Sequence, residues 1–119
     1  MDRRRGHYLG TEIDEKWWKR YRRNKFFARG TGQYWMDEEG FCFRRTLTKR
    51  PICVPFGQID RIKLGNWHAG RWCAGLTVLK ILWQKDGQRL SSGFVVSRSE
   101  AETLNLKAAI EKRAGLKPS

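Results

Sequence analysis

The chain has 119 residues, with 25 lysine and arginine residues against 12 acidic ones, and its formal net charge is +13. This length suits one domain, and the 13% of aromatic residues excludes disorder over most of the chain. No apolar run approaches the roughly 18 residues of a membrane span, and the charged N-terminus predicts no secretory signal. The cation excess predicts attraction to polyanions: nucleic acid, anionic lipid headgroups or an acidic protein.

The N-terminal region divides into two predicted parts. Residues 1–10 are expected to be a basic flexible tail, because the run RRRG has no apolar residue to anchor it. A short helix is predicted over residues 12–22, since Ile13, Trp17 and Tyr21 recur at four-residue spacing and Thr11 begins a pattern resembling a capping box. The alternative is that residues 18–27 form part of a first strand.

From residue 25 to residue 97, short apolar segments separated by turns predict β-strands. Pro51 and Pro55 confine their strand to a sheet edge, and Asp86-Gly87 predicts a tight hairpin. Strands at this spacing pair antiparallel through hairpins. The predicted strands cover residues 25–29, 33–36, 41–45, 51–56, 58–64, 76–84 and 88–97.

After Ser97 the pattern becomes helical. Ser97 or Ser99 can cap the helix, acidic residues occupy its first turn, and Gly115 is its stop signal. The predicted fold class is therefore mainly β: about seven antiparallel strands in a bent sheet or partial barrel, capped by a C-terminal α-helix. Residues 11–115 are expected to form this single domain.

The order of these segments resembles a bacterial pleckstrin-homology-like (PH-like), GRAM-related domain. The resemblance covers roughly residues 26–114, and it is carried by YWMDEEGFCFRR (34–45), ICVPFGQIDRIKLG (52–65), LKILWQKDGQRLSSGFVVS (79–97) and the closing helix. Val54-Pro55, Ile59 and Ile62 match an xxIPxxxIxxI stretch that follows the second hairpin in such domains. The resemblance implies a non-enzymatic module that binds a lipid headgroup, a peptide or a protein. The tryptophan common in the final helix of eukaryotic members is absent, so the resemblance supports the fold more than a phosphoinositide ligand.

Two clusters of cations are candidate anion-binding sites. The first lies within residues 16–29 among aromatic residues, a mixture that suits a membrane interface and also single-stranded nucleic acid. The second lies on the loop after the predicted strand 41–45, with no acid between its members. The alternative is a solvated basic surface over an aromatic core. The candidate anion-binding residues are Arg20, Arg22, Arg23, Lys25, Arg44, Arg45, Lys49 and Arg50.

The loop GNWHAGRWCAG (65–75) is long for a hairpin connection. Its two tryptophans, Trp67 and Trp72, either fold over the mouth of the barrel or serve as anchors for a protein partner. His68 lies between them and is expected to be a loop or core-edge histidine rather than a catalyst.

Catalytic and metal-binding patterns are missing from the sequence. We find no nucleophile–base–orienter set, phosphate-binding loop or dinucleotide fingerprint, so we expect no enzyme and no cofactor. Cys42, Cys53 and Cys73 are odd in number and lack a CxxC pair, which favours reduced thiols in a cytosolic protein and no metal site.

Together these patterns predict a cytoplasmic binding module, able to act peripherally at the membrane, whose basic face recognises anionic lipid or a protein partner. Two alternatives remain. One is a nucleic-acid-binding protein, favoured by the mixture of aromatic and basic residues. The other is a self-assembling module that pairs through the proline-bounded edge strand 52–56.

Overall fold

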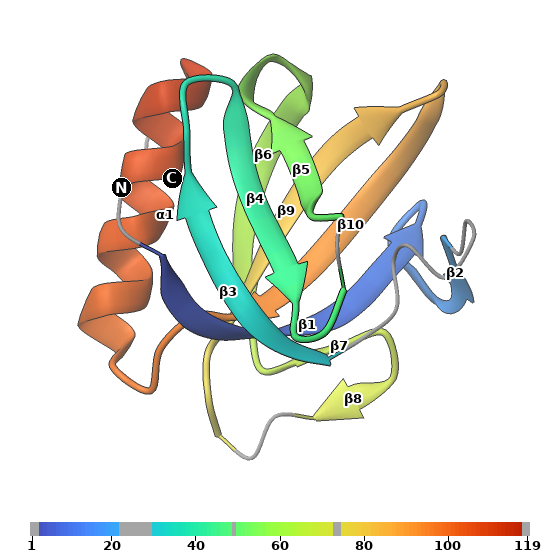
Figure 1. Cartoon of the computed structure of the whole chain (residues 1–119). Coiled ribbons are helices and arrows are strands. Elements are labelled where there is room, and N and C mark those ends of the chain that lie inside the picture. Colours follow the sequence, from blue (N-terminus) through green and yellow to red (C-terminus); the bar gives the residue numbers. More distant parts are fainter. Residues whose placement is uncertain (1–2, 22–29, 49, 73–74, 118–119) are drawn as a thin grey trace.

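The computed structural model describes residues 3–21, 30–48, 50–72 and 75–117, and for Trp17, Arg20, Arg71 and Trp72 it describes the backbone alone. The strands form a strongly bent antiparallel sheet, and the helix lies along one side of it (Figure 1). The elements are β1 (Arg4–Ile13), β2 (Lys16–Arg20), β3 (Gly30–Met36), β4 (Gly40–Arg45), β5 (Ile52–Pro55), the 3-10 turn η1 (Phe56–Gln58), β6 (Ile59–Gly65), β7 (Trp67–His68), β8 (Arg71–Trp72), β9 (Val78–Lys85), β10 (Gln88–Val95) and α1 (Glu100–Ala114).

Within the described residues, seven strands follow one another in the order β5-β4-β3-β1-β10-β9-β6. The short strand β2 pairs with β1 beside this path, and β7 pairs with β8 separately. This architecture confirms the predicted fold class. The sheet is open, because β5 and β6 stand at its two ends, and η1 connects them. The helix α1 packs against η1 and β6.

Strand β1 joins the two halves of the sheet. Residues 4–8 pair with β3 and residues 7–13 pair with β10, with a register shift in the second pairing between Tyr8 and Gly10. Gly10 has a φ of 111°, a conformation that glycine adopts without strain, and a bulge of this kind increases the local bend of a strand.

The expectation of a flexible tail over residues 1–10 is wrong for the part that the structure describes. Arg4 and Arg5 pair through their backbones with Tyr34 and Gln33, while Tyr8 and Leu9 are buried. Ladder hydrogen bonds need no apolar side chain, so a strand with a solvated outer face can begin in a run of arginines.

The predicted helix over residues 12–22 is also wrong. Asp14 and Glu15 have φ values of 54° and 56° and form a tight turn, and the chain then returns as β2. The extended conformation of the end of β1 is fixed by its pairing with β10, where Ile13 lies opposite Leu90. This long-range pairing overrides the helical spacing of apolar residues. The predicted strand 25–29 lies outside the described residues.

The core is rich in aromatic rings from both halves of the sheet. Phe94 on β10 lies 5.1 Å from Phe41, 5.3 Å from Tyr8 and 5.7 Å from Phe43, measured between ring centroids. Phe41 and Phe43 both contact Phe94 and so share one face of β4, as the sequence pattern predicts, although Cys42 between them is buried as well. Trp83 joins this core and donates its indole N–H to Ser92 Oγ over 2.9 Å.

The helix α1 begins and ends as predicted. The Ser99 side chain accepts a hydrogen bond from the Glu102 backbone, and Gly115 ends the helix with a φ of 73°. Its buried stripe is less expected, because Lys107 and Glu111 lie on it beside Leu106 and Ile110. Lys107 Nζ lies 3.0 Å from Glu111 Oε2, and the side chains are 9% and 5% exposed.

Cys42 and Cys53 form a disulfide between β4 and β5, which corrects the expectation of reduced thiols at these two positions. They are directly opposite in the register, with their Cα atoms 4.1 Å apart. The residues are 11 positions apart in sequence, and only the pairing of their strands shows that they meet.

The same register shows which groups of β5 face the open edge of the sheet. A Cα separation of 4.1 Å marks Cys42–Cys53 as a non-hydrogen-bonded pair, so the backbone groups of Cys53 point away from β4. Pro51 and Pro55 lie two residues before and after Cys53, so their backbone groups also point away from β4. A proline nitrogen has no N–H to donate. Over residues 51–55 the open edge therefore offers one N–H, which protects it against pairing with another strand. The self-assembly alternative is for this reason not favoured.

Candidate functional site

A hollow of about 520 Å³ lies on the outer face of the first half of the sheet, beside the β4–β5 turn. Arg5, Gln33 and Arg44 occupy one row across β1, β3 and β4, because Gln33 is the register partner of both arginines. The turn closes the hollow on one side. Its lining consists of Arg5, Gln33, Arg44, Thr46, Leu47 and Thr48.

Hydrogen bonds hold the β4–β5 turn in place. Thr46 N donates to Thr31 O over 2.9 Å, and the backbone N–H and hydroxyl of Thr48 donate to Arg45 O over 3.1 and 2.6 Å. Leu47 stands at the tip with a φ of 68° and a fully exposed side chain. The turn is therefore held in place while it presents an apolar side chain to solvent.

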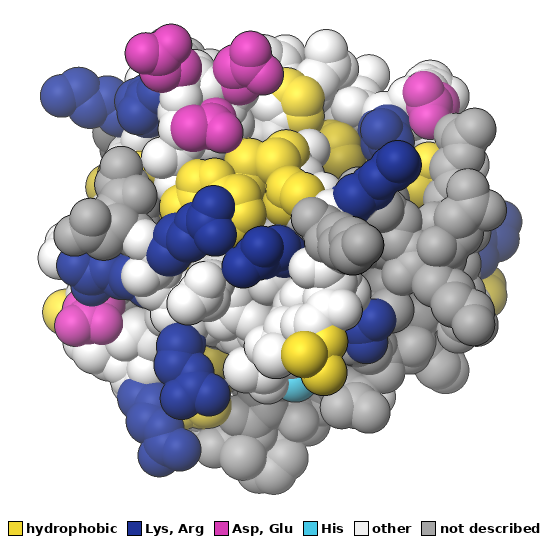
Figure 2. Space-filling view, in the orientation of Figure 1, with side chains coloured by type: hydrophobic (Ala, Val, Ile, Leu, Met, Phe, Trp, Pro, Cys, Tyr) yellow, Lys and Arg dark blue, Asp and Glu magenta, His cyan; other side chains and the backbone are white. Residues whose placement is uncertain are grey.

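The charges around the hollow are separated along the β3–β4 hairpin. Acidic side chains gather over the hairpin end that joins β3 to β4, and cationic side chains form a band across the middle of the same face (Figure 2). An apolar patch lies between the two groups. Neither Arg5 nor Arg44 forms an ion pair with another described residue, so their charges are available to an external anion.

The structure places only some of the predicted site residues. Arg44 lines the hollow, and Arg50 is exposed in the connection to β5. Arg45 packs along Gly30, where a Cβ atom would lie 2.6 Å from Arg45 Cδ. Arg20 lies in β2 with its backbone alone described. Arg22, Arg23, Lys25 and Lys49 lie outside the described residues.

Arg5 and Gln33 belong to the hollow but are not among the predicted site residues. Arg5 falls in the predicted tail, and Gln33 is the first residue of a predicted strand. Their shared row with Arg44 depends on the pairing of β1 with β3, which links positions 28 residues apart in sequence. A signal in the sequence is that Arg5 precedes a Gly-His-Tyr-Leu segment whose last two residues are apolar.

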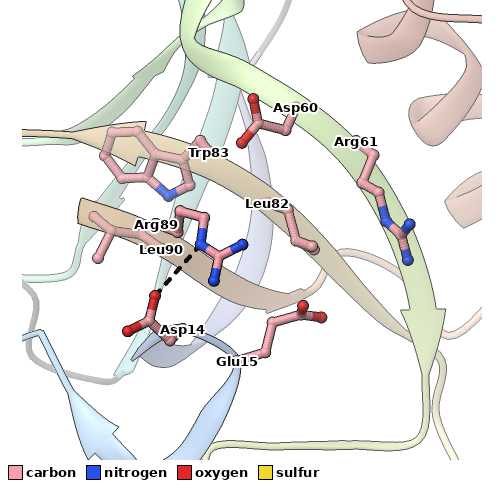
Figure 3. A pocket seen from close by; sticks show the side chains of 8 residues that line it. All are labelled: Asp14, Glu15, Asp60, Arg61, Leu82, Trp83, Arg89 and Leu90. Atoms are coloured by element: carbon pink, nitrogen blue, oxygen red, sulfur yellow. Dashed lines mark ion pairs between the residues drawn. The ribbon is translucent and has the colours of Figure 1, made fainter. Parts of the chain in front are cut away.

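A second cavity, of about 250 Å³, lies between the β1–β2 turn, β6 and the ends of β9 and β10 (Figure 3). Several of the charged groups in its lining already interact with neighbouring side chains. Arg89 Nε lies 3.4 Å from Asp14 Oδ1, and Gln84 donates to Asp60 over 3.1 Å. The Glu15 carboxylate accepts a hydrogen bond of 2.6 Å from Lys63 Nζ, which lowers the Glu15 pKa. With three carboxylates against two guanidinium groups in its lining, this cavity is a weaker candidate for an anion site than the hollow.

The long loop after β6 contains the β7–β8 pair, in which Trp67 lies opposite Trp72. Trp67 is 44% exposed, so it does not form part of the core. The side chain of Trp72 lies outside the described part of the structure. The neighbouring His68 is completely buried.

Among the described residues, no group of three or more histidine, cysteine, aspartate or glutamate side chains gathers closely enough to hold a metal ion. Within the same residues, no helix has both the length and the apolar character needed to cross a membrane.

The described residues thus form a bent antiparallel sheet capped by a helix, with a basic hollow beside one of its turns. The chain belongs to the bacterial PH domain-like family, whose model matches residues 1–110. The match includes β1, which is central to the sheet. Comparisons with curated proteins and with solved structures found no match. PH-like domains are generally non-catalytic binding modules, and they commonly bind lipids or proteins.

Proposed function

We propose that this protein is a non-catalytic module that docks on anionic membrane surfaces, with the hollow beside the β4–β5 turn receiving the phosphate of a lipid headgroup. The observation that carries the proposal is the row of Arg5, Gln33 and Arg44 in a polar hollow. Guanidinium groups donate several hydrogen bonds in a fixed plane, which matches the oxygens of a phosphate. Such a module would act peripherally, on the cytoplasmic side of a membrane.

Leu47 supports a membrane rather than a soluble anion as the source of the phosphate. It lies at the rim of the hollow, fully exposed, on the turn that connects Arg45 to Arg50. At a bilayer surface an aliphatic side chain enters the boundary of the acyl chains, while neighbouring cations remain with the phosphates. A soluble phosphate compound would leave Leu47 in water.

The first test is co-sedimentation of the whole chain with anionic and with neutral vesicles at two salt concentrations. A fluorescent single-stranded oligonucleotide and inorganic pyrophosphate serve as competitors. We expect binding to anionic vesicles alone, weaker at high salt, that survives both competitors. Displacement by pyrophosphate would identify a soluble anion site. Transfer to the oligonucleotide, with a logarithmic affinity that falls linearly with the logarithm of salt, would assign the basic face to nucleic acid.

Replacing Leu47 with serine is expected to weaken binding to anionic vesicles about tenfold, because burial of a leucine side chain contributes about 1.5 kcal/mol or more. Leu104→Ser on α1 is the matched control, since Leu104 is 46% exposed and does not line the hollow. Vesicle titration followed by sedimentation measures both variants. Equal binding by Leu47→Ser and the unmodified protein would show that the turn does not enter the bilayer.

A further inference from the structure

The β7–β8 loop, residues 66–72 and here called the flap, is held on the sheet by the buried side chain of His68. His68 Nε2 lies 3.1 Å from the carbonyl oxygen of Gly10 on β1. The imidazole ring fits where Gly93 of β10 has no side chain, because a Cβ atom there would come within 2.5 Å of His68 Cγ. Gly10 and Gly93 are themselves register partners. The flap therefore docks on the outer face of β1 and β10, where Gly93 leaves space for the ring and Gly10 supplies a carbonyl oxygen.

Glu12 of β1 completes the attachment. Its Oε2 accepts a hydrogen bond of 2.9 Å from the Ala69 backbone N–H, so one carboxylate oxygen holds the flap backbone. The other, Oε1, lies 3.7 Å from His68 Nδ1. Because a carbonyl oxygen can only accept, Nε2 carries the proton that is donated to Gly10. Nδ1 has no hydrogen-bond partner among the described residues.

The surroundings of the ring disfavour a second proton on it. Burial is the largest influence and lowers the pKa of His68 below its ordinary value. Lys80 of β9 acts in the same direction. The Glu12 carboxylate and the backbone groups of Gly10 and Ser91 act in the opposite direction and do not outweigh burial. The docked flap is thus matched to a neutral imidazole.

We propose that the flap is a pH-sensitive latch: protonation of His68 releases residues 66–72 from the face of β1 and β10. The direction of the pH effect follows from the linkage between proton binding by His68 and docking of the flap. In the released flap His68 is hydrated and binds a proton at an ordinary pKa, whereas the docked ring binds it more weakly. Docking is therefore complete above the ordinary histidine range and weakens as the pH falls through it, by up to about tenfold for each unit of difference in pKa. Release uncovers the space beside Gly93 and the carbonyl oxygen of Gly10, and it frees Trp67.

Amide hydrogen exchange tests the latch, measured as protection factors so that intrinsic pH effects are removed. Between pH 7.5 and pH 5.5 we expect the protection of the Ala69 amide to fall about tenfold, while amides of β9 and β10 in the core keep theirs. In His68→Gln the pH response should disappear, whatever the level of protection, because glutamine does not titrate. His7→Gln is the matched control and should keep the response, since His7 is the other histidine of the chain.

Gly93→Ala supplies a reference for the released state, because its Cβ would occupy the space of the His68 ring. Low protection of the flap at both pH values, with a protected core, would support the latch. If this variant loses core protection as well, the comparison of His68→Gln with His7→Gln still shows whether His68 controls the pH response of the flap. Unchanged flap protection in the unmodified protein, or an equal pH response in His68→Gln, would overturn the proposal.

Discussion

Replacing Arg5, Arg44 and Arg50 together with glutamine is expected to weaken binding to anionic vesicles roughly a hundredfold. Arg5 and Arg44 line the hollow, and Arg50 is exposed on the connection that carries Leu47. A cation near an anionic membrane surface contributes about 1 kcal/mol, so the loss of three removes about 3 kcal/mol of binding free energy. The loss should be largest at low salt, where screening of the remaining charges is weakest.

The control must lose the same charge from elsewhere on the molecule. Arg61, Arg98 and Lys117 are exposed and lie on β6, before α1 and after α1. Glutamine at these three positions gives an identical net charge and should weaken binding much less. If both triple variants bind equally poorly, the whole positive field of the protein attracts the vesicles, and the hollow is not a specific site.

Replacing Glu111 with alanine is expected to lower the free energy of unfolding by about 3 kcal/mol, the largest stability effect that we predict. Lys107 Nζ lies 3.0 Å from Glu111 Oε2 on the buried stripe of α1, with both side chains less than a tenth exposed. Removing the carboxylate takes away a charge that compensates the buried ammonium group. Urea unfolding followed by circular dichroism measures the change.

Two further variants separate the buried pair from ion pairs in general. Lys107→Met combined with Glu111→Leu should recover most of the stability, because apolar side chains of similar volume suit this position. Glu15→Ala breaks the ion pair with Lys63, whose side chains are 36% and 51% exposed, and should cost less than about 1 kcal/mol. A loss in Glu111→Ala as small as that in Glu15→Ala would mean that water still solvates Lys107.

Local patterns were sufficient for the elements that form from residues close together in sequence. The shared face of Phe41 and Phe43 in β4, the Asp86-Gly87 hairpin and the Ser99 and Gly115 caps of α1 are confirmed at nearly the predicted positions. In each case the atoms that stabilise the element belong to the same short segment. The resemblance of residues 26–114 to a PH-like domain added the order of the strands and the closing helix.

The errors concern features whose partners are distant in sequence. Residues 4–13 become a strand because β3 and β10 lie on either side of them. The apolar spacing of Ile13, Trp17 and Tyr21 is helical, but the backbone pairing of β1 with β10 decides the conformation of Ile13. The burial of His68 also depends on distant residues, since Gly93 leaves space for its ring and the Gly10 carbonyl accepts its hydrogen bond.

The candidate site likewise has a part that the sequence indicated and a part that depends on tertiary structure. The arginines at positions 44, 45 and 50 were recognisable from the sequence as an uncompensated basic cluster on a loop. The hollow itself, with Arg5 and Gln33 beside Arg44, required the register of three strands. By itself the sequence determined the fold class, the capped helix and the basic character of the surface, because periodicity, capping and charge are local or additive properties. Only the tertiary structure decided which residues meet, because long-range strand pairing depends on the whole sheet and not on any one segment.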